Sequence, residues 1–193
     1  MRGRGRPYTG ISKALKDQLM TKIMEIDCTG TFHLFMPSKF PCLDVLDEFS
    51  FFASSILMES GFEVIDGLGD RGRGHTTHIS ILSPKEQDVV KASGAIDVRK
   101  RWNYKKIEFE VTGVNFWHHY SRKYDERKIV CALEINCPDI LKIREELGFP
   151  EVKVEVTNVP VEAEVDVIDH KKPNVVDLGD FSCHMTVAQK VLN

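Results

Sequence analysis

Two stretches, HTTHISIL at residues 75–82 and FSCHMTVA at residues 181–188, decide the expected fold of this chain. In each stretch polar and apolar residues alternate as they do in a β-strand, and each contains the pattern His-x-Ser/Thr. Successive side chains of a strand point to opposite faces, so the histidine and the hydroxyl residue of one copy share a face. The copies are His78-Ile79-Ser80 and His184-Met185-Thr186. Because they lie far apart along the chain, we expect them to face each other across a groove between two sheet halves.

The rest of the chain alternates between helix and strand patterns. Apolar spacings of three and four residues, with glycine and proline breaks, predict helices at 11–26, 43–60, 85–93 and 138–147. Alternating or apolar runs predict strands at 31–36, 62–65, 107–114, 128–135 and 151–168, while 116–127 reads as a hairpin loop. This order predicts a mixed α+β fold with antiparallel sheets. We expect a flexible basic N-terminus plus an accessory helix at 1–30 and a single domain at 31–193.

Composition narrows the class of protein. The chain has 193 residues, 42% of them hydrophobic and 28% charged, which excludes a disordered or fibrous protein. Its formal net charge of -3 argues against a protein that coats long nucleic acid, but leaves room for a small phosphorylated ligand or a local basic groove. The five cysteines are irregularly spaced and form no CxxC pair, so neither a disulfide framework nor a zinc finger is expected. We expect a cytoplasmic protein with no membrane contact and no obligate protein partner.

The two motifs suit the cleavage of a phosphodiester. A neutral imidazole can take a proton from the nucleophile, and a protonated imidazole can give one to the leaving oxygen. Histidine titrates near neutral pH, so both forms are available. His78 and His184 are therefore the predicted acid–base pair, with the assignment of acid and base left open. Ser80 and Thr186 can hydrogen-bond the phosphate oxygens, and this chemistry requires no metal and no cofactor.

With this pair of motifs the chain resembles the two-histidine (2H) phosphoesterase superfamily, whose members carry two H-x-[S/T]-x motifs. HISIL and HMTVA are similar to that pair, and the pattern of strands and helices is similar over about residues 31–190. The resemblance implies a bilobal α+β fold with two antiparallel sheets around a central cleft and outer helices. It also implies activity on 2′,3′-cyclic phosphates, 2′,5′-linked oligoadenylates, RNA 3′ ends or cyclic oligonucleotide messengers.

Two further segments are candidates for substrate binding. A glycine-rich loop precedes the first motif, and its arginines can reach a phosphate or simply lie in solvent. The segment FWHHYSRKY, which starts at residue 116, combines aromatic and basic side chains that suit a nucleobase and its phosphates, or forms an exposed hairpin tip. The candidates are Arg71, Arg73, Trp117, Tyr120, Arg122 and Tyr124.

Three alternatives stay open. One is a phage-type anti-immune nuclease specific for cyclic di- or trinucleotides, which the overall acidity slightly favours over an enzyme acting on long RNA. Another is a nucleotide- or RNA-binding module without turnover, although a pure binder has no need of two proton-transfer groups. The third is a metallohydrolase that uses His75 and His78 with Cys183-His184, although the carboxylate cluster or cysteine pair usual in such sites is missing nearby.

Overall fold

The computed structural model describes residues 7–34, 41–64, 77–121, 126–149 and 183–192, and these residues form helices and strands in mixed order. The helices are α1 (Lys13–Ile23), α2 (Glu48–Leu57), the short 3-10 helix η1 (Met58–Ser60), α3 (Pro84–Ser93), α4 (Ile96–Trp102) and α5 (Pro138–Glu146). The strands are β1 (Thr29–His33), β2 (Cys42–Val45), β3 (His78–Ser80), β4 (Lys106–Glu108), β5 (Glu110–Ser121), β6 (Glu126–Asn136) and β7 (His184–Leu192). The predicted mixed α+β class is therefore confirmed.

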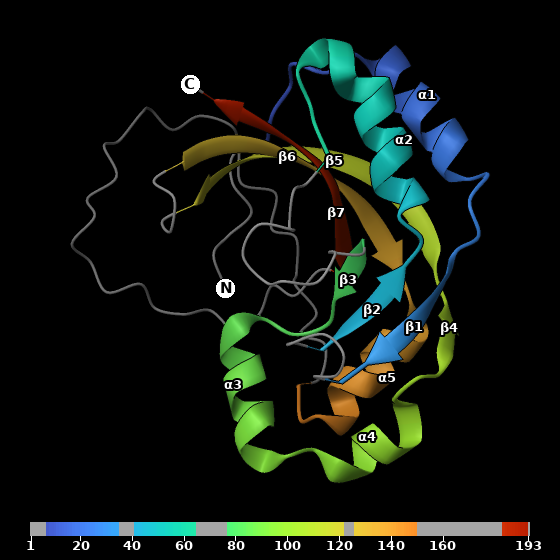
Figure 1. The fold of residues 1–193 in the computed structure, drawn as a ribbon, viewed down its shortest axis with the longest axis vertical. Coiled ribbons are helices and arrows are strands. Elements are labelled where there is room, and N and C mark those ends of the chain that lie inside the picture. Colours follow the sequence, from blue (N-terminus) through green and yellow to red (C-terminus); the bar gives the residue numbers. More distant parts are fainter. Residues whose placement is uncertain (1–6, 35–40, 65–76, 122–125, 150–182, 193) are drawn as a thin grey trace, which may run out of the picture.

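The described strands form one antiparallel sheet in the order β4-β1-β2-β3-β7-β6-β5. The sheet curls into a half-barrel (Figure 1). We expected two antiparallel sheets around a cleft, but the described strands are joined into one sheet because β3 pairs with β7. The four strands β4-β1-β2-β3 thus continue directly into the three strands β7-β6-β5.

One face of the sheet carries the hydrophobic core. Helices α1 and α2 lie together at one end of the molecule, and α3, α4 and α5 gather at the other end (Figure 1). Leu19 and Ile23 of α1 are fully buried in the same core cluster as Phe49 and Leu57 of α2 and the apolar residues of the strands. The helix that we expected to be accessory is therefore part of the common core.

Most helices begin and end where the sequence signals predict. Ser12 caps α1 through its hydroxyl, which accepts from the Leu15 amide at 3.2 Å. Ser83 and Glu86 form a capping box that starts α3, and Gly94 ends that helix in the left-handed conformation. Helix α5 confirms the prediction for 138–147 closely.

The structure corrects three local predictions. Residues 43–45, predicted as the start of a helix, belong to β2, because this strand pairs with β1 on one side and with β3 on the other. Residues 116–121, predicted as loop, continue β5, because β6 pairs with them as far as Ser121. Helix α4 was not predicted at all. The helix is only seven residues long and Val98 is its one buried residue, so its sequence shows only a weak apolar pattern.

Two further predictions of strands are confirmed in part or concern residues outside the described part of the chain. Of the predicted strand 62–65 the structure describes residues 62–64, and among these Glu63 forms an isolated bridge with Gln189. The predicted strands at 151–168 lie outside the described residues. None of the described helices has the length and apolar character needed to cross a membrane.

Candidate functional site

The two His-x-Ser/Thr motifs lie side by side on neighbouring strands. Ile79 of β3 pairs with Met185 of β7 in antiparallel register, and both side chains are completely buried. Residues on either side of this pair point to the opposite face of the sheet. His78 and Ser80 therefore share that face with His184 and Thr186, and each of these four residues is partly exposed. We expected the copies to face each other across a groove, and they are instead direct neighbours in one sheet.

The register also sets the spacing of the two histidines. One step from the Ile79–Met185 pair, an antiparallel ladder brings His78 opposite Thr186 and Ser80 opposite His184. His78 and His184 are then diagonal neighbours, about 7–8 Å apart at the backbone. Two imidazole side chains at this separation can reach the same small anion from two directions.

Strand β3 is only three residues long, and hydrogen bonds hold it at its start. The Thr77 amide donates to Asp47 Oδ1 at 2.7 Å, and the Thr77 hydroxyl lies 3.1 Å from the same oxygen. The Thr77 hydroxyl also lies 2.8 Å from Ser50 Oγ, in a buried contact with α2. These bonds fix the backbone immediately before His78.

An ion pair holds the chain just beyond β3. Arg144 of α5 donates to the Ile81 carbonyl at 2.6 Å and to Glu86 Oε1 at 3.0 Å. The side chains of Arg144 and Glu86 are only 3% and 6% exposed. Burial alone would raise the pKa of Glu86, but the bonds from Arg144 and from the Ser83 amide lower it on balance. The strand that carries His78 and Ser80 is thus anchored on both sides.

Each motif histidine has a carboxylate residue opposite it on the next strand outward. Asp44 of β2 pairs with His78, and Glu134 of β6 pairs with His184. Directly opposite residues of an antiparallel pair have side chains on the same face and within reach of each other. A carboxylate at this position favours the protonated form of an imidazole and can orient its ring. Neither carboxylate residue was among the residues predicted from the sequence.

Asp44 belongs to a small polar cluster beside His78. Its Oδ2 lies 3.1 Å from His33 Nε2, and its Oδ1 accepts from the Cys42 thiol at 3.2 Å. His33 is 8% exposed and Cys42 is completely buried, so this side of the cluster is shielded from water. The Asp44 carboxylate is therefore fixed in place next to the first motif.

Glu134 is held on the opposite side of the site. The Asn115 amide of β5 donates to Glu134 Oε1, and the other carboxylate oxygen lies over Gly113. A Cβ atom at Gly113 would come within 2.8 Å of Glu134 Oε2. Glycine at this position leaves the space that the carboxylate occupies, beside the irregularity in β5 between Val111 and Gly113.

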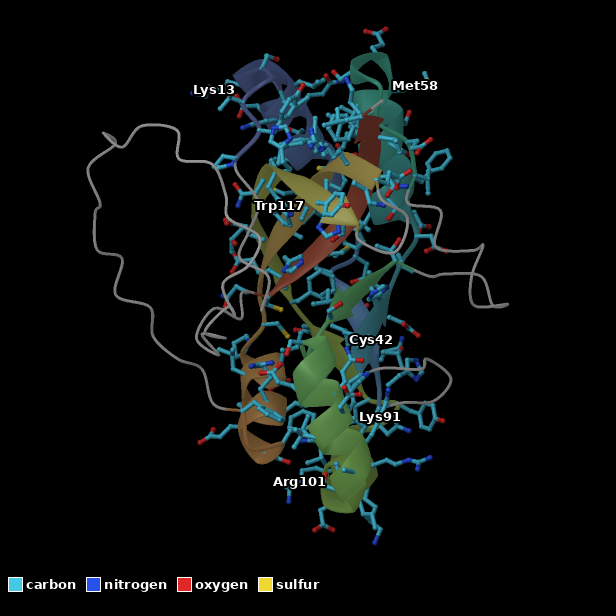
Figure 2. The ribbon with its side chains drawn as sticks, turned by 90° about the vertical axis from the view of Figure 1, so that its left-hand side faces the viewer. Lys13, Cys42, Met58, Lys91, Arg101 and Trp117 are labelled. Atoms are coloured by element: carbon cyan, nitrogen blue, oxygen red, sulfur yellow. The ribbon has the colours of Figure 1, made fainter. Side chains whose placement is uncertain are left out.

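Trp117 is the substrate-binding candidate that the structure brings to the motifs. Its ring meets the His184 ring edge to face, with centroids 5.6 Å apart and planes at 83°. Figure 2 shows Trp117 in the middle part of the molecule, between the end that carries Lys13 and the end that carries Arg101. Trp117 was assigned to a loop, and its rigid position on β5 makes its contact with His184 well defined.

Of the remaining candidates, the described part of the chain contains Tyr120, which is not brought to this site. Tyr120 lies three residues after Trp117 on the same strand, so its side chain points to the other face. It is 48% exposed. Four other substrate-binding candidates and one metal-binding candidate lie outside the described residues, namely Arg71, Arg73, Arg122, Tyr124 and His75.

The cysteine next to the second motif is a neutral thiol. Burial raises the pKa of Cys183 to about 12, and the nearby Cys137 adds to this effect. The thiol is therefore protonated at neutral pH and is a weak nucleophile in this state. Within the described segments no three His, Cys, Asp or Glu residues are grouped in a way that could hold a metal ion.

No protein-family model matches the chain, and neither a curated protein nor a solved structure matches it. The resemblance to the two-histidine phosphoesterases thus depends on the residues of the chain and on their placement.

Proposed function

We propose that the protein is a phosphodiesterase that cleaves a nucleotide phosphodiester by general acid–base catalysis with His78 and His184. The observation that carries this proposal is the Ile79–Met185 pair, because it puts both motifs on one partly exposed face of the sheet. The substrate would be a 2′,5′-linked or 2′,3′-cyclic RNA end, or a cyclic oligonucleotide messenger. The bilobal fold of the two-histidine phosphoesterases belongs to the same proposal, with the strands on either side of the β3–β7 pair as its two lobes.

In the proposed mechanism the phosphate lies above β3 and β7. One imidazole removes the proton from a ribose hydroxyl or a water molecule, and that oxygen attacks phosphorus. The other imidazole donates a proton to the oxygen that leaves. Ser80 and Thr186 donate hydrogen bonds to the non-bridging oxygens as negative charge develops on them. These steps use only the side chains of the chain.

The flanking residues have supporting roles. Asp44 and Glu134 would position His78 and His184 and favour their protonated forms. Trp117 restricts the His184 ring on one side and offers part of its own face to a nucleobase. A site of this kind supports turnover better than simple binding, since both histidines come with a carboxylate neighbour.

The test is a panel of 2′,3′-cyclic, 2′,5′-linked and 3′,5′-cyclic nucleotides, with products separated by chromatography in the presence of excess chelator. We expect turnover of at least one class and a bell-shaped dependence of rate on pH. His78→Ala and His184→Ala should each lower kcat by about a hundredfold or more. Ser80→Ala and Thr186→Ala should have smaller effects.

Two results would contradict the proposal. Full activity in both histidine variants would show that the motifs do not carry the chemistry. Activity that disappears with chelator and returns with a divalent metal would favour the metallohydrolase alternative, in which His75 and His78 are ligands.

A further inference from the structure

A strongly basic segment lies near the histidine face, at the junction of α4 and β4. Residues 99–106 read RKRWNYKK, with five cationic and two aromatic side chains in a chain whose net charge is -3. Every cationic residue of the segment is exposed, namely Arg99, Lys100, Arg101, Lys105 and Lys106. The net charge argued against a protein that coats long nucleic acid but left room for a local basic groove, and this segment is a local concentration of positive charge.

Most of this charge is available to a ligand. Arg101 forms an ion pair with Glu146 of α5 at 2.9 Å. For the other four cations, the described part of the chain contains no ion pair within 4.0 Å. Lys105 extends over the Trp102 ring, 5.1 Å from its centroid, and so lies on the surface beside it.

Tyr104 gives the segment an aromatic surface. It is 61% exposed, and its ring meets the His33 ring edge to face at a centroid distance of 5.4 Å. Its backbone is in the left-handed region with φ of 65°, which is uncommon for a tyrosine. The bond from the Tyr104 amide to the Phe32 carbonyl, 2.8 Å long, holds the residue in this conformation. An exposed ring held this firmly is suited to stacking with an unpaired base.

The sheet connects this segment to the proposed catalytic residues. Lys106 pairs with Thr31, Thr31 pairs with Asp44, and Asp44 pairs with His78. These paired residues share one face of the sheet, so Lys106 lies on the histidine face. Three strand spacings separate it from His78, which is about 14 Å.

A nucleic-acid strand that follows the row of paired residues from Lys106 to His78 passes one carboxylate in that row, the one of Asp44. Its two oxygens are engaged by His33 and Cys42, as described above.

We propose that Arg99–Lys106 binds single-stranded nucleic acid, with phosphates on its exposed cations and one base on Tyr104. The position of this strand relative to the histidines rests on the function proposed above, whereas the binding itself does not. The bound strand runs from the basic segment across β1 and β2 and brings a phosphodiester further along the strand to His78 and His184. This favours an oligonucleotide over a small cyclic messenger as the substrate.

The test measures binding of a fluorescent single-stranded RNA by anisotropy, using the His78→Ala/His184→Ala double variant so that no cleavage occurs. We expect Lys100→Gln/Lys106→Gln to weaken binding about tenfold or more at low salt. The slope of log affinity against log salt should become less steep by about 1.4, because each single-strand phosphate contact contributes about 0.7. Tyr104→Asn should weaken binding at least about fivefold, since asparagine tolerates the left-handed backbone but removes the ring.

Lys13→Gln is the matched control, since Lys13 is an exposed helix lysine at the opposite end of the molecule from Arg101 (Figure 2). It should leave affinity and salt slope unchanged. In the active protein, Lys100→Gln/Lys106→Gln should lower kcat/KM for the oligonucleotide while leaving turnover of a 2′,3′-cyclic mononucleotide unchanged. That contrast separates loss of this surface from loss of the catalytic site.

Three results would overturn this inference. They are the absence of RNA binding by the double histidine variant, an equal effect of the Lys13 control, and binding of anionic lipid vesicles without binding of RNA. Failure of catalysis alone would leave the binding result intact, so the two proposals fail separately.

Discussion

The indole of Trp117 meets the imidazole of His184 edge to face, although the two residues lie on strands separated by β6. The contact crosses β6 near Ala132, the residue that pairs with Asn115 on one side and Thr186 on the other. The small side chain of Ala132 leaves room for the larger ring above it. This contact fixes one wall of the proposed site.

Substitutions of Trp117 test whether its contact with His184 contributes to activity. Trp117→Ala frees the His184 ring, and we expect kcat/KM to fall by about tenfold, within the range typical of a positioning loss. Trp117→Phe keeps an aromatic edge against His184 and should recover most of the loss. Steady-state kinetics on the substrate identified by the nucleotide panel measures both variants. Equal activity of Trp117→Ala and the unmodified protein would show that the contact is only structural.

Variants of Asp44 and Glu134 can show which of the two histidines is the general acid and which is the general base. A nearby carboxylate raises the pKa of an imidazole, so Asp44→Asn should lower the pKa of His78 and Glu134→Gln should lower that of His184. The general acid controls the alkaline limb of the pH–rate profile and the general base controls the acidic limb.

If His184 is the acid, Glu134→Gln moves the alkaline limb to lower pH and Asp44→Asn moves the acidic limb to lower pH. If His78 is the acid, the two effects are exchanged. Profiles of kcat and kcat/KM measured over pH 4–10 distinguish the cases. If both limbs of the pH–rate profile stay at the same pH in both variants, the carboxylates do not act on the histidines.

Gly113 provides an independent test of Glu134. In Gly113→Ala the new methyl group displaces Glu134 Oε2, which lies at the end of a flexible side chain and can move away. The free energy of unfolding should therefore change by less than about 1 kcal/mol. The pH–rate profile should nevertheless shift in the same direction as in Glu134→Gln. Unfolding by urea and the pH profile together check this, and a large loss of stability would contradict it.

The buried pair of Glu86 and Arg144 makes stability depend on pH. The pKa of Glu86 is lowered from its reference value of 4.5 in the folded protein. The stabilisation is therefore fully present above about pH 4.5, and it is lost as pH falls through the lower folded value. Glu86→Gln should reduce the free energy of unfolding by about 3 kcal/mol at pH 7, because it leaves Arg144 buried without its ionised partner.

The loss in Glu86→Gln should become smaller as pH falls through the lowered folded pKa of Glu86, because the unmodified protein then also loses the charge of this residue. Urea unfolding at pH 7 and at low pH measures the difference. Lys142→Gln is a suitable control, since it removes an exposed bond to Asp139 on the same helix and should cost little. A Glu86→Gln effect that does not depend on pH would contradict this account.

The sequence predicted the motif strands well and their partners poorly. Alternation around Ile79 and Met185 correctly assigned the buried and exposed faces, because this pattern depends only on neighbouring residues. Residues 43–45 were misassigned to a helix because such a short run next to a true helix has no period of its own. Pairing with two strands decided its structure.

Asp44 and Glu134 were missed for a related reason. Which residue stands opposite a histidine depends on the register between strands, and register is not encoded in the spacing along one strand. A usable signal was present, since Glu134 is the one charged residue inside the run IVCALEI. A charge in a strand of this kind implies a polar site on one face. The basic segment at 99–106 was also not predicted, because the net charge of -3 is a sum over the whole chain and does not show where charges of one sign gather.

The pairing of β3 with β7 has a consequence for how the protein is made. β3 and its His78 leave the ribosome long before β7, so the two imidazoles first meet only after the later strand has docked. A nascent chain that stops short of β7 leaves the β3 edge without this partner and lacks His184. In the mechanism proposed above, activity would therefore begin only once β7 has docked beside β3.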